Sequence, residues 1–178
     1  MLQITVPATE FYDDKENRFI EIKEHHLRLE HSLVSVSKWE SYWEKPFISS
    51  SKNETELRDY IRFMTLTQNV DPRVYFCLTD ENFIAIRDYI DAPMTATTIS
   101  EVKGKNNREI ITSEIIYYWM ISFNIPFECE KWHLNRLLML IRVCSIKNQP
   151  KKKPNQRSAA QKRKAINDAR RMKHNTRG

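Results

Sequence analysis

The stretch REIITSEIIYYWMISFNIPFECEKWHLNRLLMLIRVCSIKNQP, from Arg108 to Pro150, holds the densest supply of large apolar side chains in this 178-residue chain. Its spacing predicts two helices, one from about Arg108 to Phe123 and one from Glu128 to Ile146, with a break at Pro126. Because the connection is short, we expect an antiparallel helix pair. Burial of its large side chains, at roughly 1.5 to 3 kcal/mol each, should dominate the stability of the fold.

This pair has more apolar side chains than one helix contact can hide, Leu134 and Leu140 among them. Such side chains are either buried against other helices or exposed as a patch that binds a partner. Burial is the commoner outcome for helices that are apolar all round. The sequence favours burial and leaves the partner-binding patch as the alternative.

A short helix is predicted well upstream of this pair. Ser35 or Ser37 can cap it, and it would carry Trp39 and Trp43, which lie four residues apart and therefore on one face. Pro46 should end it.

Three further helical segments follow. The first runs from Glu54 to Met64, and the second is a short piece that Asp71 caps and Pro72 begins. Thr79 or Asp80 should cap the third, which reaches about Asp91. The predicted inward side chains are Leu57, Tyr60, Ile61 and Met64 on the first of these helices and Phe83, Ile86, Tyr89 and Ile90 on the last.

Residues 1–34 have the alternating pattern of β-strands. Leu2–Val6, Phe19–Ile22 and Leu27–Glu30 alternate apolar and polar residues, and polar clusters at Asp13–Asn17 and Lys23–His26 are typical of turns. The sequence therefore predicts a mainly α-helical protein with a small N-terminal antiparallel sheet. We expect one globular domain over residues 1–150, β-rich in 1–34 and helical in 35–149.

The charge of the chain is divided unevenly. Residues 151–178 hold 11 Lys and Arg and one acid, Asp168; removing these from the totals of 29 basic and 23 acidic residues leaves 18 and 22 for the body. The segment is predicted to be a flexible or conditionally helical tail that binds nucleic acid or an acidic protein surface, or that only solvates the chain. Its basic residues include Lys151, Lys152, Lys153, Arg157, Lys162, Arg163, Lys164, Arg170 and Arg171.

Several classes of function are disfavoured. The only glycines are Gly104 and Gly178. The chain therefore contains no glycine-rich phosphate loop, no dinucleotide-binding fingerprint and no hydrolase nucleophile elbow, since each of these motifs needs closely spaced glycines. We find no catalytic signature and expect a protein that is not an enzyme and needs no cofactor. The N-terminus does not resemble a secretory signal, and the most apolar stretch is too short to span a membrane.

A metal site is considered and disfavoured. Cys129 and His133 are four residues apart, a spacing that can hold zinc, and His25, His26 and His31 could be imagined as further ligands. Nothing in the spacing brings these residues together. A packed cysteine and a hydrogen-bonded histidine are the expected outcome.

Four stretches carry a resemblance to a known family. They are LEHSLVSVSKWESYWEKPF (Leu29 to Phe47), MTLTQNVDP (Met64 to Pro72), DYIDAPMTATTI (Asp88 to Ile99) and the opening stretch, Arg108 to Pro150. Together they are similar to the tail assembly chaperones of long-tailed, siphovirus-type bacteriophages.

The resemblance implies a protein that acts in the cytoplasm of the infected cell and is absent from the mature virion. It would bind the coiled-coil tape measure protein while tail tube subunits polymerise around it, and the tail tube protein and a second copy of the chain are further partners to consider. The resemblance also implies that such proteins are often made in a short and a frameshift-extended form.

The resemblance supplies no residue-level binding site. If a partner helix is held by its apolar stripe, the candidate contact residues are Trp39, Trp43, Trp119, Trp132, Leu134 and Leu140. Core burial is the competing interpretation for each tryptophan. Two other functions stay open: a nucleic-acid-associated phage protein that acts through the basic tail, and a structural protein at the head-tail junction.

Overall fold

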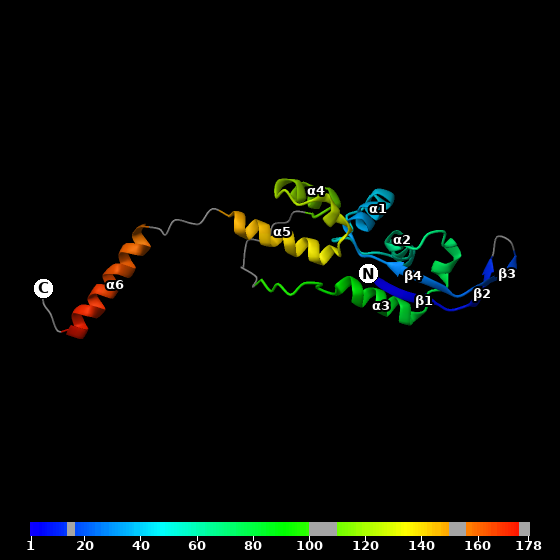
Figure 1. Cartoon of the computed structure of the whole chain (residues 1–178), viewed down its shortest axis with the longest axis horizontal. Helices are drawn as coiled ribbons and strands as arrows, with labels where there is room; N and C mark the ends of the chain where they lie inside the picture. Colours follow the sequence, from blue (N-terminus) through cyan, green and yellow to red (C-terminus); the bar gives the residue numbers. More distant parts are fainter. Residues whose placement is uncertain (14–16, 100–109, 150–155, 175–178) are drawn as a thin grey trace. The chain divides into compact units, whose positions relative to one another are not determined.

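The computed structural model describes residues 1–13, 17–99, 110–149 and 156–174, and the chain divides into two compact units, Met1–Ser145 and Ile146–Gly178. This division lies inside a helix, whereas the sequence placed it near Pro150. In chain order the elements are β1 (Leu2–Val6), β2 (Thr9–Asp13), β3 (Arg18–Ile22), β4 (His25–Leu29), α1 (Leu33–Trp43), α2 (Glu54–Met64), η1 (Pro72–Phe76), α3 (Asp80–Asp91), α4 (Ser113–Ser122), η2 (Phe127–Lys131), α5 (Leu134–Asn148) and α6 (Gln156–His174) (Figure 1).

The predicted fold class is confirmed: the protein is mainly helical, with small antiparallel sheets at the N-terminus. β1 pairs with β4 from Leu2 opposite Leu29, and β2 pairs with β3 from Thr9 opposite Ile22. Pro7 lies where the two pairings are interrupted, and a proline has no N–H to donate to a neighbouring strand.

Two details of this region differ from the expectation. β2 was not predicted. His25 and His26 belong to β4, so the predicted turn at Lys23–His26 shortens to Lys23 and Glu24. The other predicted turn, at Asp13–Asn17, falls mostly outside the described residues.

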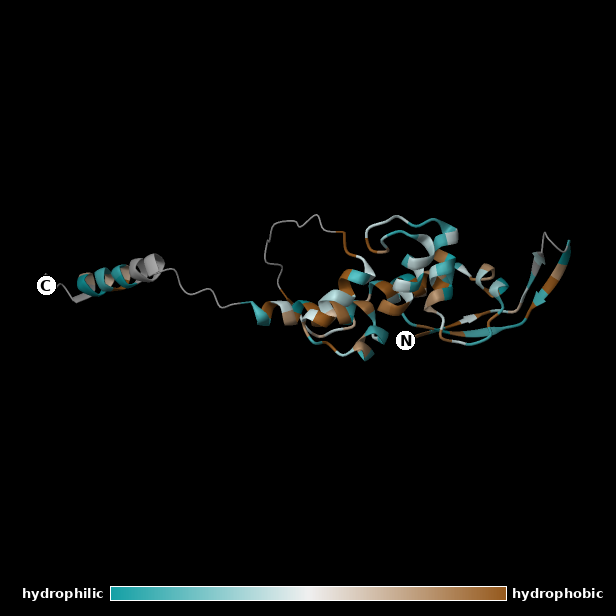
Figure 2. Ribbon diagram, turned by 90° about the horizontal axis from the view of Figure 1, so that it is seen from above, coloured by the Kyte–Doolittle hydropathy of each residue, from teal (hydrophilic) through white to brown (hydrophobic). Residues whose placement is uncertain are grey.

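The β2–β3 hairpin forms an arm that extends beyond the helices of its unit (Figures 1 and 2). Two of its aromatic side chains are open to solvent: Phe19 is 69% and Tyr12 41% exposed, and their rings lie edge-on with centroids 5.0 Å apart. β1 and β4 differ, because Ile4, Val6 and Leu27 are buried against the helices.

Capping motifs in the sequence explain where most helices begin. Asn53 and Glu56 form a capping box that begins α2, and Thr79 and Asn82 form another that begins α3. Of these residues the sequence analysis predicted Thr79 as a cap, with Asp80 as the alternative. Asp71 caps η1 as expected. For α1 the prediction was wrong: Ser32 is the N-cap. The hydroxyl of Ser35 instead points back to accept a hydrogen bond from the Ser32 N–H, which completes the box.

The boundaries of the C-terminal helix pair differ from the predicted ones. α4 begins at Ser113 instead of Arg108, which itself lies outside the described residues, and the predicted helix from Glu128 is divided into η2 and α5. The division has a long-range cause, because the backbone N–H of Leu134 donates to the carbonyl of His31 (2.7 Å) and Ser32 forms a β-bridge with His133. The closest backbone neighbour of α4 is α1 and not α5.

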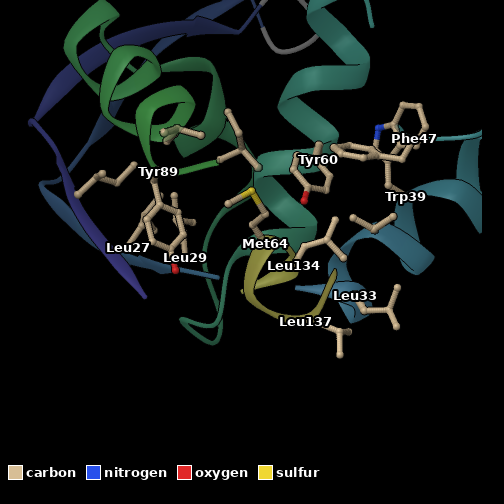
Figure 3. Packing of buried hydrophobic residues seen from close by; sticks show 14 of the residues in the cluster. Leu27, Leu29, Leu33, Trp39, Phe47, Tyr60, Met64, Tyr89, Leu134 and Leu137 are labelled. Carbon is tan, nitrogen blue, oxygen red and sulfur yellow. The ribbon is translucent and has the colours of Figure 1, made fainter. Parts of the chain in front are cut away.

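The core lies where α1, α2, α3, α5 and the β1–β4 sheet meet. Figure 3 shows Met64 between Leu27 and Leu29 on one side and Trp39 and Phe47 on the other. Aromatic rings fill the second side, with Phe47 centred 5.2 Å from Trp39 and 4.2 Å from Tyr60. Such pairs add to the hydrophobic term because their edges and faces attract.

A buried carboxylate connects three segments of this core through hydrogen bonds. Glu40 of α1 accepts hydrogen bonds from the backbone N–H of Phe47 and from that of Ser113, each at 2.7 Å. The second bond satisfies one of the free N–H groups at the start of α4, for which the N-cap residue Thr112 makes no side-chain bond. Glu40 therefore fixes where α4 begins.

Candidate partner-binding surface

A groove of about 470 Å³ lies between α2 and α3, and we call it the α2–α3 groove. Each of the two helices packs mainly on other elements, α2 on α1 and η1, and α3 on β1. Asn82 strengthens the second contact, since its amide donates to the carbonyl of Thr5 (3.2 Å). The groove is lined by Glu54, Leu57, Phe83, Ile84, Ile86, Arg87 and Ile90.

The groove floor consists of apolar side chains of α2 and α3, most of which are only partly buried. Ile86 is buried, and Phe83 and Ile90, which flank it one turn away on each side, are half-buried. Leu57 of α2 is also half-buried, and Ile84 is 50% exposed at the edge. A concave, mostly apolar surface of this kind is typical of a binding site.

The charged residues of the lining are Glu54 and Arg87, but acids outnumber bases on α3, which forms one side of the groove. Four exposed acids of α3, Asp80, Glu81, Asp88 and Asp91, outnumber its single base, Arg87. On the opposite side Glu54 forms an ion pair with Arg58. This excess of acids therefore favours a ligand that combines apolar side chains with positive charge.

The predicted contact residues do not line this groove. Trp39 is fully buried, with its indole N–H donating to the carbonyl of Glu56 (2.8 Å), and Leu134 is buried in the core. The hypothesis that these two residues contact a partner is therefore wrong, because each is sealed by packing. The remaining candidates, Trp43, Trp119, Trp132 and Leu140, are half-buried.

The half-buried tryptophans have contacts within their own unit. The guanidinium of Arg136 lies 4.2 Å from the ring centre of Trp132, and the ammonium of Lys45 lies 5.9 Å from that of Trp43. Both geometries are those of cation–π contacts. The indole N–H of Trp43 is buried without a hydrogen-bond partner.

Helix α4 presents a second apolar surface, which we call the α4 surface and define by Tyr118 and Ile121. These residues are 65% and 61% exposed and lie one turn apart. The sequence predicted surplus apolar side chains in this region but named others.

One sequence signal could have pointed to the groove. The pattern of α3 predicted Phe83, Ile86, Tyr89 and Ile90 as inward, and Ile84 falls outside that stripe. A large aliphatic residue beside the inward stripe widens the apolar face beyond what one packing contact covers. The depth of the groove could not be predicted, because it depends on α2 and α3 packing on different neighbours.

Two of the histidines considered for a metal site do meet. The rings of His31 and His133 are 5.0 Å apart, but Cys129 lies on η2, away from the helix that follows His133. Burial raises the pKa of the Cys129 thiol, and Glu128 adds to the effect. Among the described residues no group of three or more His, Cys, Asp or Glu side chains is placed to hold a metal ion.

The histidine pair is instead a buried hydrogen-bond network. His133 donates through Nε2 to the carbonyl of Tyr89 (2.9 Å) and accepts at Nδ1 from the N–H of Asn135 (3.3 Å), which is the pattern of a neutral ring. His31 bonds the hydroxyl of Tyr60. Burial lowers the pKa of His31 to about 3, and the nearby His133 contributes.

The second unit contains α6 of the predicted basic tail. Every side chain described for it, from Arg163 to Met172, is exposed. Lys151, Lys152 and Lys153 lie outside the described residues, as do the side chains of Arg157 and Lys162.

In the part of the chain that the structure describes, no helix combines the length and the apolar character that a membrane crossing requires. Comparison with known proteins adds no assignment: no family model, curated protein or solved structure matches this chain.

Proposed function

We propose that this protein is a tail assembly chaperone of a long-tailed bacteriophage, which binds the tape measure protein and catalyses no reaction. The resemblance of four stretches of the sequence suggests the role. The observation that carries the proposal at the level of the molecule is the α2–α3 groove, an apolar surface left open between two helices that pack elsewhere.

The groove suits one stripe of an amphipathic helix. A helix presents apolar side chains every three to four residues, and Leu57, Phe83 and Ile90 offer an apolar floor for them. Since acids outnumber bases on α3, the occupant would be a segment of the tape measure protein that carries Lys or Arg beside its apolar stripe. A bound chaperone would cover that stripe and prevent the free protein from aggregating.

The test is co-expression of the full chain with the tape measure protein from the same phage genome. Ile84→Asp places a carboxylate at the apolar edge of the groove. We expect it to weaken binding by about tenfold or more, because a carboxylate held against the apolar stripe of the ligand loses its hydration without gaining a partner. The readouts are the soluble fraction of the tape measure protein and its co-purification with the chaperone.

A matched control keeps the result specific. Leu66→Asp makes the same kind of change at a residue that is 51% exposed and does not line the groove, and it should leave binding unchanged. Ile121→Asp tests the α4 surface in the same assay. If Ile121→Asp abolishes binding and Ile84→Asp does not, the groove is the wrong site; if wild-type protein never retains the tape measure protein in solution, the proposed function is wrong.

A further inference from the structure

Helix α6 carries a concentration of positive charge that the groove does not use. Its 19 residues include seven Lys or Arg and a single acid, Asp168. The four bases Arg163, Lys164, Arg170 and Arg171 are all exposed. This helix therefore presents a strong positive field to solvent.

The helix period sorts these bases into two lines. Arg163 and Arg170 are seven residues apart, as are Lys164 and Arg171, so each pair lies on one side of α6 at a separation of about 10.5 Å along the axis. The two lines are adjacent, about 100° apart around the helix. Asp168 borders the second line and leaves the first uninterrupted.

Between Arg163 and Met172, small and apolar residues occupy the other side of α6. Ala165, Ile166, Ala169 and Met172 fall within a sector of about 120°. Only Ile166 and Met172 among them are large. A helix that lies in a membrane surface needs a broad apolar face, commonly with Trp, Phe or Leu, so this face is too poor for that role.

The basic face matches a polyphosphate backbone. Arginine pairs with phosphate through two parallel N–H donors, and closely spaced bases gain affinity by releasing condensed counterions. α6 contains no Phe, Tyr or Trp, the side chains on which unpaired bases stack most strongly. These features favour a duplex, read through its phosphates, over a single strand.

We propose that α6 binds double-stranded nucleic acid through the phosphate backbone, without preference for sequence. Arg163, Lys164, Arg170 and Arg171 make the contacts. The proposal is independent of the chaperone function, because it involves none of the residues of the α2–α3 groove.

The test uses the full chain and two labelled probes, a 20-base-pair DNA duplex and an RNA duplex of arbitrary sequence, with fluorescence anisotropy across a salt series. Four phosphate contacts predict a slope of roughly −3.6 for log K against log salt. The variant R163Q/K164Q/R170Q/R171Q should lose at least about 30-fold in affinity near 50 mM salt, and its slope should approach zero.

A control variant removes the same charge elsewhere. R28Q/K38Q/K131Q/R142Q changes four exposed bases of the body and lowers the net charge equally. It should keep affinity within about threefold. Equal losses in both variants would show that net charge and not α6 is responsible, and would overturn the proposal.

Two further arms identify the partner class. Vesicles of phosphatidylglycerol and a poly-glutamate competitor offer negative charge without a duplex. If either binds the wild-type chain as tightly as the duplexes at equal charge concentration, duplex recognition is refuted, as it is if neither duplex binds at low salt. Preference for DNA or for RNA then names the source of the phosphates.

Discussion

At the scale of single residues, Glu40 has the largest structural effect for its size. Its two carboxylate oxygens accept from two backbone N–H groups that are otherwise without partners in the interior, those of Phe47 and Ser113. Glu40→Ala leaves both donors buried and unpaired, which should lower the free energy of unfolding by about 2 to 4 kcal/mol. Urea denaturation followed by circular dichroism measures the change.

Glu40→Gln provides a graded comparison. The amide keeps one oxygen acceptor and replaces the other with an N–H₂ group that faces a donor, so the loss should be smaller than for alanine but clear. Glu128→Ala removes an exposed glutamate and should change stability by less than about 0.5 kcal/mol. Equal stability of Glu40→Ala and the wild type would contradict the capping role.

At the scale of elements, the four N-terminal strands should differ in local stability. β1 and β4 bury one face against the helices, whereas β2 and β3 pair only with each other, reach the core through Ile22 at the end of β3, and expose Phe19 and Tyr12. A two-stranded ribbon without a covering layer is only marginally stable in water. Hydrogen exchange should therefore be faster for the amides of β2 and β3 than for those of β1 and β4.

Mass-spectrometric detection on peptides from each strand pair makes this comparison within one sample. Comparable protection in both pairs would mean that something covers the arm in solution, such as a second copy of the chain. Phe19→Ser should then increase exchange in the arm, whereas in an uncovered arm it should leave exchange nearly unchanged.

The elements also show what the sequence could and could not predict. α2 was predicted at its observed position from its apolar stripe, and α3 from its stripe together with a capping signal at Thr79 or Asp80. The start of α5 could not be predicted, since it depends on hydrogen bonding between His31 and Leu134, about a hundred positions apart in the chain. Local patterns carry no information about such a contact.

The candidate site, too, was predictable only in part from the sequence. The apolar character of Leu57, Phe83 and Ile90 was evident from their helical spacing, so the residues of the groove were partly predictable. The tryptophans were predicted as partner contacts on the basis of residue type alone. Trp39 is buried for a reason that spacing cannot reveal, which is that Phe47, Lys52 and a backbone carbonyl of α2 lie against its ring.

At the scale of the whole molecule, the His31–His133 pair links the stability of the first unit to pH. The folded-state pKa of His31 is about 3, below its ordinary value of 6.5, so the unfolded chain binds a proton more readily than the folded one. The contribution is fully present above pH 6.5 and is lost as the pH falls toward 3. Between pH 7 and pH 5 we expect a loss of about 2 kcal/mol from this residue.

The measurement is urea unfolding at pH 7, 6 and 5 for the wild type, for His31→Gln and for His26→Gln. His31→Gln should be less stable at pH 7, because the Tyr60 hydroxyl loses its ring partner, and it should show a flatter dependence on pH. His26 is exposed, and its replacement should leave the wild-type dependence intact. An unchanged slope in His31→Gln would rule out this residue as the source.

The bond from Glu40 to Ser113 also has a consequence for the order of folding. The two residues are 73 positions apart, so a nascent chain presents α1 to solvent long before the ribosome has released the beginning of α4. Until then one oxygen of this carboxylate has no backbone donor from α4 and must remain hydrated. The core therefore cannot be completed before Ser113 has been made, and a product terminated before it would also lack the core side chains that α4 and α5 supply, Ile116, Met120, Leu134 and Leu137.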